Sequence, residues 1–171
     1  MIIKNNSIKL KSCSHSATLK EFVSDVPYAA FLGINIILKD NKLTSLLPYS
    51  PKLIGNPALP ALHGGVTASF LEISAVLELF WASISTIQKK ELGDSIELKQ
   101  FANFSHSQIP KTIDFTVDYL RPGLPKDAYA RAKIKRAGRR YASVYVEAWQ
   151  DNKKKLYAQA SGHFLMPLIH E

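Results

Sequence analysis

Cysteine and long apolar runs are both scarce in this 171-residue chain. The one cysteine, Cys13, excludes an intramolecular disulfide and a zinc site built from cysteines. No uninterrupted apolar run reaches the roughly 20 residues that a membrane-spanning helix needs. Residues 1–16 also contain no apolar stretch long enough for a signal peptide. We therefore expect a cytoplasmic protein without a membrane partner.

Acidic residues are few relative to basic ones. Lys and Arg number 22 and Asp and Glu number 14, so the net charge is 22 − 14 = +8. Such a surplus favours nucleic acid, anionic lipid or a phosphate-bearing ligand, although a solvated basic face gives the same count. The chain contains no nucleic-acid-binding motif, and its five histidines have no metal-ligand spacing. We therefore expect neither a nucleic-acid partner nor a bound metal.

The length suits one domain with a sizeable core. The first dozen residues have no clear period, and we predict a partly flexible N-terminal segment over 1–25 and a single domain over 26–171. Alternating apolar residues on both sides of Asp40-Asn41 predict a β-hairpin over 34–47. Four later segments alternate as well, and their short connections predict an antiparallel meander of strands over 112–120, 128–136, 140–149 and 156–165.

Residues 64–87 form the longest apolar segment, GGVTASFLEISAVLELFWASISTI. It has no proline, has no glycine after Gly65, and is apolar on nearly all sides, so it predicts a buried helix. A hairpin, a buried helix and a run of strands together predict an α+β fold, with a curved antiparallel sheet wrapped around one central helix. The polar residues 88–108 either extend this helix or form a lid.

The predicted helix opens with His63-Gly64-Gly65, after a proline-rich loop. The first amide groups of a helix have no internal acceptor, and the helix dipole is positive there. Because glycine lets a ligand approach the backbone closely, the Gly64 N–H is well placed to hydrogen-bond a carbonyl oxygen that gains negative charge. A plain loop-to-helix junction has the same sequence pattern.

Glu72 lies within this otherwise apolar helix. A buried carboxylate needs a partner or a catalytic task, and a water-poor site suits a general base or a nucleophile. A partly exposed glutamate, or one paired with a lysine or arginine, is the structural alternative. Glu78 points about 120° away around the helix, and we interpret Glu78 as the structural carboxylate.

The spacing of Gly64 and Glu72 bears on assembly. The two residues are about 12 Å apart along a helix axis, so a Glu72 side chain cannot reach a carbonyl held at its own helix start. If both residues serve one reaction, Glu72 comes from a second chain whose helix runs antiparallel. This hypothesis predicts a homodimer with two shared sites.

Five segments of the sequence carry a resemblance to a known family. They are VPYAAFLGI, NPALPALHGGVTASFLE, TIDFTVDYLRPG, AGRRYASVYVEAW and ASGHF. Together they resemble the PaaI-type hotdog-fold acyl-CoA thioesterase superfamily from about Val26 to Pro167. The resemblance implies a hotdog fold, an acyl-CoA substrate, no cofactor beyond the coenzyme A of that substrate, and a homodimer that often pairs into a dimer of dimers.

The resemblance also implies roles for single residues. The Gly64 amide would polarise the thioester carbonyl, and Glu72 of the partner subunit would be the general base or nucleophile. Thr112, at the start of TIDFTVDYLRPG, would orient the attacking water. Asn56 lies near a position that helps to bind the carbonyl, and His63 would hold the loop and the helix start.

Four further residues are expected to contact the substrate. Gly65 adjoins the expected carbonyl site, and arginine forks suit the phosphates of coenzyme A. The candidates for the phosphate side are Arg121, Arg139 and Arg140. Two departures from the family pattern are a proline-rich loop one residue longer before His63 and the long segment 88–108.

Two other functions agree with the same sequence. A hotdog enoyl-CoA hydratase or dehydratase also pairs a histidine with a helix carboxylate, although the dehydratases separate them more widely. A non-catalytic hotdog module that binds acyl-CoA would share the fold. The sequence leaves open the acyl chain (short, long or aromatic), the choice between dimer and tetramer, and the role of Glu72 as nucleophile or general base.

Overall fold

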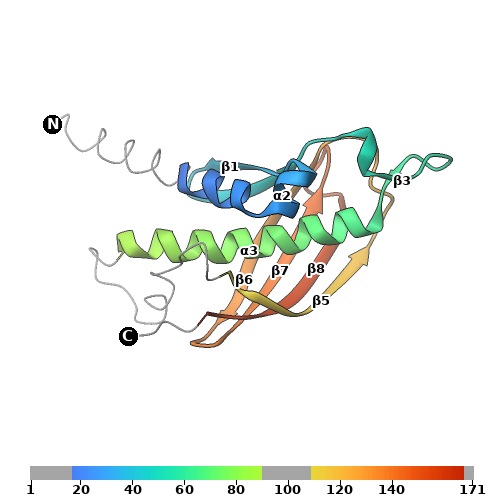
Figure 1. Ribbon diagram of the computed structural model, residues 1–171. Coiled ribbons are helices and arrows are strands. Elements are labelled where there is room, and N and C mark those ends of the chain that lie inside the picture. Colours follow the sequence, from blue (N-terminus) through green and yellow to red (C-terminus); the bar gives the residue numbers. More distant parts are fainter. Residues whose placement is uncertain (1–16, 90–108, 168–171) are drawn as a thin grey trace.

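The computed structural model describes residues 17–89 and 109–167 (Figure 1). Most of the segment 88–108, predicted to extend the helix or form a lid, lies outside the described residues, as do 1–16 and 168–171. Residues 17–25 are helical. The elements that follow are α2 Pro27–Leu32, β1 Asn35–Lys39, β2 Lys42–Leu47, a 3-10 turn Pro51–Leu53, β3 Ile54–Asn56, β4 Ala61–Leu62, α3 Gly64–Lys89, β5 Lys111–Tyr119, β6 Ala128–Ala137, β7 Tyr141–Trp149 and β8 Leu156–Leu165.

One antiparallel sheet carries the fold, with its strands in the order β1-β2-β6-β7-β8-β5. The predicted hairpin, buried helix and four later strands are all present. The predicted meander is correct for β6, β7 and β8 but wrong for β5, which pairs with β8 and not with β6. Residues 120–127, which include Pro122 and Pro125, separate β5 from β6, and prolines disfavour a tight hairpin ladder there.

α3 crosses the inner face of this sheet and forms the centre of the hydrophobic core (Figure 1). Large side chains of the helix are fully buried, among them Phe70, Leu71, Leu77 and Leu79. The sheet faces them largely with small side chains, which allow a close approach of helix and strands: Ala128, Ala130, Ala142, Ala148, Ala158 and Ala160. Gly64–Ser83 is long and apolar enough to cross a membrane by length and composition alone, but half of it is buried in this core.

The helical residues 17–25 contribute to the same core. Leu19, Phe22 and Val23 are buried, and the Phe22 ring stacks on Phe80 of α3 with ring centroids 4.2 Å apart. In Figure 1 this helix and α2 lie along α3. The hydrophobic core therefore includes side chains from before residue 26, where we placed the start of the domain.

A β-bulge interrupts the alternation of β5. Thr112 pairs with Phe164 of β8 while Asp114 pairs with His163, and the register shifts between them at Ile113. Strict alternation over 112–120 would place Thr112 on the same face as Asp114, but the extra residue turns Thr112 toward the helix. Asp114 stays on the outer face, where both carboxylate oxygens lie 2.9 Å from His163 Nδ1.

Gly162 of β8 provides a test of how tightly β5 packs on the sheet. A Cβ at Gly162 would overlap the Phe115 ring and approach the Asp114 backbone oxygen to 3.0 Å. We expect Gly162→Ala to lower the free energy of unfolding by about 1–3 kcal/mol, measured by calorimetry or denaturant titration. Gly138→Ala is the control, because its Cβ would meet only the Tyr141 backbone oxygen at an ordinary 3.5 Å. Equal stabilities would contradict the packing described.

Candidate active site

The start of α3 is fixed by His63. The Gly65 N–H donates to His63 Nδ1 at 2.9 Å, and the Thr67 N–H donates to the His63 backbone oxygen at 3.0 Å. Gly64 is the first residue of the helix, so its N–H has no intrahelical acceptor, and none of the hydrogen bonds recorded among the described residues uses it. Of the two glycines, Gly64 therefore offers the free amide, while the Gly65 amide serves the cap.

Tyr119, at the end of β5, holds the same helix start from the other side. Its hydroxyl donates to the Gly64 carbonyl oxygen at 2.8 Å, and its ring lies 3.5–3.6 Å from where a Cβ of Gly64 would be. No motif in the sequence marks Tyr119 as a site residue. It lies seven residues after Thr112 on a predicted strand, but only the folded structure brings it to Gly64.

The loop before α3 is built around a second close contact. A Cβ at Gly55 would lie 2.8 Å from His63 Cδ2 and 3.0 Å from His63 Cα, so only glycine fits there. Asn56 is exposed, and its Oδ1 accepts the Ala58 N–H at 2.9 Å, which closes an Asx turn. In this chain Asn56 shapes the β3–β4 turn, and its side-chain NH₂ group remains as a donor for a ligand or a second chain.

Glu72 and Thr112 are brought together by the bulge in β5. The Thr112 hydroxyl donates to Glu72 Oε1 at 2.5 Å, and the two residues are 40 positions apart in the sequence. Glu72 is partly exposed, so its second oxygen, Oε2, is left for a substrate or a water molecule. A carboxylate whose one oxygen is held by a fixed donor has a defined orientation for proton abstraction or attack.

Within one chain Gly64 and Glu72 remain separate. They occupy the same straight helix eight residues apart, which is about 12 Å along its axis. β5 touches both places, since Thr112 reaches Glu72 and Tyr119 reaches Gly64. The strand therefore fixes two half-sites at opposite ends of one face.

The three predicted phosphate-binding arginines are not brought together in one chain. Arg121 follows β5, and its Nη1 donates to the Leu156 backbone oxygen at 3.0 Å. Arg139 and Arg140 are exposed in the turn between β6 and β7, at the other end of the sheet. Arg121 thus lies at the Gly64 end of β5, whereas Arg139 and Arg140 lie at the end where Thr112 meets Glu72.

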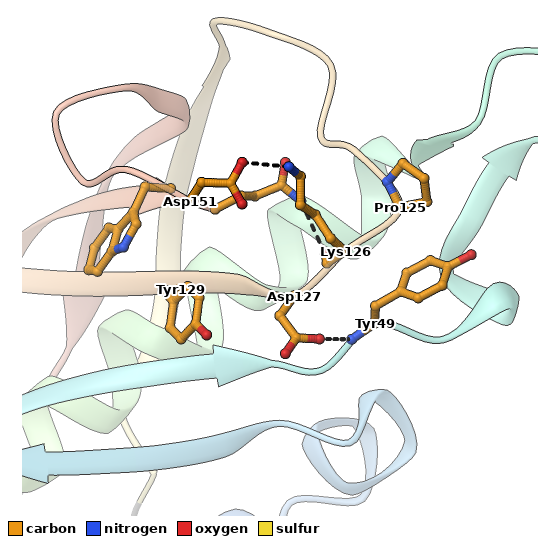
Figure 2. Close-up of a pocket in the computed structure, with 8 residues that line it drawn as sticks. Tyr49, Pro125, Lys126, Asp127, Tyr129 and Asp151 are labelled. Atoms are coloured by element: carbon orange, nitrogen blue, oxygen red, sulfur yellow. Dashed lines mark hydrogen bonds and ion pairs between the residues drawn. The ribbon is translucent and has the colours of Figure 1, made fainter.

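Two pockets lie near the starts of β6 and β8. One of about 660 Å³ is lined by Tyr49, Asp127, Tyr129 and Trp149 among others, and Figure 2 shows the Tyr49 N–H donating to Asp127, at 2.7 Å. Arg121 lines a neighbouring pocket of about 380 Å³. Across residues 17–89 and 109–167, no three His, Cys, Asp or Glu side chains gather as metal ligands would.

The chain is similar in sequence and in fold to known proteins of one superfamily. A family model described as the thioesterase superfamily matches residues 59–157. The medium/long-chain acyl-CoA thioesterase YigI of Escherichia coli is 33% identical over 147 residues, which cover 85% of this chain and 88% of that protein. A solved structure from Chromobacterium violaceum is 30% identical, with a TM-score of 0.62, over 97% of this chain and 99% of that one. Another, from Shewanella oneidensis and related to the thioesterase superfamily, is 26% identical with a TM-score of 0.68, over 90% and 96%.

The matched region agrees with the geometry of the site. It contains the capped helix start at Gly64, the hydrogen-bonded pair of Glu72 and Thr112, and Tyr119. The fold of one long helix inside an antiparallel sheet is the fold of the solved relatives. The resemblance drawn from the sequence and the predicted fold class are therefore confirmed, and this chain belongs to the thioesterase superfamily, as a thioester hydrolase of the hotdog fold.

Proposed function

We propose that this protein hydrolyses acyl-CoA, with Glu72 as the base or nucleophile and the Gly64 amide as the donor to the thioester carbonyl. The observation that carries the proposal is the 2.5 Å hydrogen bond from Thr112 to Glu72, which holds a carboxylate in a fixed orientation on the central helix. A medium or long acyl chain is the substrate named for YigI, which is 33% identical. We propose the same class of acyl chain for this protein.

The reaction needs a group that takes a proton from water and a donor that stabilises the negative charge on the carbonyl oxygen. In the general-base route, Glu72 Oε2 takes a proton from water while the water oxygen bonds to the carbonyl carbon. The carbonyl oxygen becomes negative and accepts the Gly64 N–H at the positive end of the helix dipole. The C–S bond then breaks, and the thiolate takes the proton from Glu72 and leaves as the free thiol, which restores the Glu72 carboxylate. In the nucleophilic route, Glu72 attacks the carbonyl carbon, the C–S bond breaks and the thiolate leaves, taking a proton from solvent. Water then hydrolyses the resulting anhydride, which restores the Glu72 carboxylate.

Thr112 has a defined part in either route. Its hydroxyl proton is committed to Glu72 Oε1, and its oxygen lone pairs remain to accept a hydrogen bond from water. A water molecule held between Thr112 and Glu72 Oε2 is positioned for proton transfer. Thr112 is thus a positioning residue for the water and for the carboxylate.

We propose a homodimer in which each site takes Gly64 from one chain and Glu72 from the other. The 12 Å separation within one helix is the first support. A second is the partly exposed stripe on α3, which contains Glu72 and follows helical spacing through Gly65, Ser69 and Val76. A third is β5, an end strand of the sheet with exposed apolar side chains.

Antiparallel pairing would also bring the arginines into reach of one another. The Gly64 end of one chain, which carries Arg121, would lie beside the Glu72 end of the other, which carries Arg139 and Arg140. Arginines from two chains would then flank one coenzyme A molecule. Coenzyme A enters this scheme as part of the substrate, and the scheme uses no other cofactor.

Replacement of the carboxylate tests the central residue. Glu72→Gln keeps the size and removes the charge, so we expect kcat/KM to fall by about a hundredfold or more. The measurement is free-thiol release from acyl-CoAs of short, medium and long chain length. Glu21→Gln, on the exposed face of the first helix, is the matched control and should keep full activity. Equal activity of Glu72→Gln and wild type would remove Glu72 from the mechanism, and binding without turnover in wild type would favour an acyl-CoA-binding module.

The Thr112 hydroxyl can be tested by a pair of substitutions. Thr112→Val keeps the shape and removes the donor to Glu72, so we expect kcat to fall by about tenfold or more, the value of one hydrogen bond to a charged group. Thr112→Ser restores the hydroxyl and should recover most of the loss. If Thr112→Ser and Thr112→Val are equally slow, packing rather than the hydrogen bond is what matters.

Mixing two inactive variants tests the shared site. Proline is tolerated as the first residue of a helix and has no N–H, so Gly64→Pro should remove the carbonyl donor and keep the fold. Gly64→Ala adds a side chain but keeps the N–H, and is the control. Mixed Gly64→Pro and Glu72→Gln chains should recover about one quarter of wild-type activity, because half of the dimers would contain one intact site.

No recovery after verified subunit exchange would show that both residues act within one chain. Size-exclusion chromatography with light scattering, run on the same samples, reports whether the mixed species are dimers or larger assemblies.

A further inference from the structure

A cationic cleft opens where β2 and β6 separate. The two strands pair only from Ser45 to Leu47 with Ala128 to Ala130, so Lys42 and Leu43 do not pair with the continuation of β6. A pocket of about 490 Å³ occupies this gap, and Glu78 of α3 forms part of its wall. The volume falls within the range of ligand-binding pockets, about 300–1,000 Å³.

Five cations and two carboxylates line the cleft. The cations are Lys42, Arg131, Lys133, Lys135 and Lys153, and the carboxylates are Glu78 and Glu147. The charge is therefore 5 − 2 = +3 with both carboxylates ionised. In the described part of the chain none of the five cations forms an ion pair, since the pairs found there join Lys126 to Asp151 and Asp114 to His163.

Arg131 lies at the centre of this arrangement with unused donor capacity. Its Nη2 donates to Thr44 at 2.7 Å, but its Nε is buried and has no hydrogen-bond partner. The guanidinium lies 5.9 Å from the Trp149 ring, and Lys153 lies 5.2 Å from the same ring. Glu147 is the cross-strand neighbour of Arg131 on β7, but no ion pair joins the two among the described residues. A buried donor without a partner is costly, and an anion would satisfy it.

Two pKa values in the cleft are perturbed, both mainly by burial. Burial, together with the nearby charges of Arg131 and Lys42, lowers the pKa of Lys153, although Glu147 opposes the shift. Burial raises the pKa of Glu78 to about 7, against the attraction of Arg131. Near neutral pH a large fraction of Glu78 is therefore neutral, and the cleft is then more positive still.

The geometry points to a phosphate-binding site in this cleft, distinct from the site of thioester cleavage. Phosphate suits a set of lysines around one arginine, because the lysines supply point charges and the guanidinium supplies directed donors. Glu78 lies about 9 Å along the helix from Glu72 and about 120° around it. β6 is also three strands away from β5, about 14 Å across the sheet.

Two sources of phosphate fit this chemistry, the nucleotide part of coenzyme A and a separate phosphorylated metabolite. The site itself does not require that the protein cleave acyl-CoA, so its test uses direct binding. Inorganic pyrophosphate is the first probe and coenzyme A the second, both titrated by calorimetry. Trp149 fluorescence gives an independent signal, because Lys153 and Arg131 lie against its ring.

The test variant is Lys133→Gln with Lys135→Gln, two exposed side chains on β6. We expect saturable binding of pyrophosphate to wild type and a dissociation constant raised by about tenfold or more in this variant. The control is Lys20→Gln with Lys154→Gln, which removes the same charge from exposed positions outside the cleft, and it should bind as wild type does. Absence of saturable binding, or equal weakening in test and control, would overturn the proposal.

Glu78→Gln adds a readout that general charge effects would not give. Protonation of Glu78 below pH 7 removes its negative charge. At pH 6 wild type and Glu78→Gln should therefore bind the anion with similar affinity. At pH 8 wild type should bind it more weakly than Glu78→Gln does. Comparison of the two proteins at each pH cancels the titration of the ligand. The two proteins share the other charged groups that face Glu78 across the cleft, which are Lys42, Arg131, Lys133, Lys135, Glu147 and Lys153. An unchanged ratio of affinities from pH 6 to pH 8 would place the bound anion away from Glu78 and overturn the site.

Steady-state kinetics then separates the two sources. If the cleft holds the substrate, Lys133→Gln/Lys135→Gln should raise KM for acyl-CoA but not for the matching acyl-pantetheine, which lacks the nucleotide phosphates. If pyrophosphate binding is lost while both KM values stay at wild type, the ligand is a separate phosphorylated molecule. Failure of thioester cleavage in wild type would leave the binding result intact, so the two proposals fail independently.

Discussion

The burial of α3 is the constraint on which the rest of the structure depends. Its side chains are apolar on almost every side, so the helix cannot lie on a surface, and the sheet, α2 and residues 17–25 all pack against it. Small alanines on the inner face of β6, β7 and β8 let the helix sit close to the strands. Glu72 and Glu78 are the two partly exposed carboxylates of this helix, and they lie on different sides of it.

β5 connects the packed helix to the candidate active site. Two hydroxyl groups of this strand reach the helix, because the bulge at Ile113 turns Thr112 toward Glu72 and Tyr119 contacts Gly64. Thr112 orients Glu72, and Tyr119 with His63 orients the start of α3. Secondary-structure elements therefore hold both candidate groups in place without a ligand, as the proposed stabilisation of a developing oxyanion requires.

Two groups of basic residues lie in separate places in the described structure. Arg121, Arg139 and Arg140 lie at the two ends of the sheet, in positions that an antiparallel dimer would combine around one substrate. Arg131 and its neighbouring lysines instead gather in the gap between β2 and β6, on another part of the sheet. Two chemically different groups of basic residues therefore lie on separate parts of the described structure.

The sequence by itself determined the long strands, the central helix and the motif, but not the short strands β3 and β4 in the proline-rich stretch. Alternating apolar residues predicted the strands, and a long apolar segment predicted α3. The spacing of Gly64 and Glu72 on one helix predicted that a second chain completes the site. Only the tertiary structure decided that β5 pairs with β8, that the bulge turns Thr112 to Glu72, and that Tyr119 reaches Gly64. The reason is physical: periodicity records which face of an element is apolar, whereas strand order, a bulge and contacts 40 to 55 residues apart arise only when the elements pack.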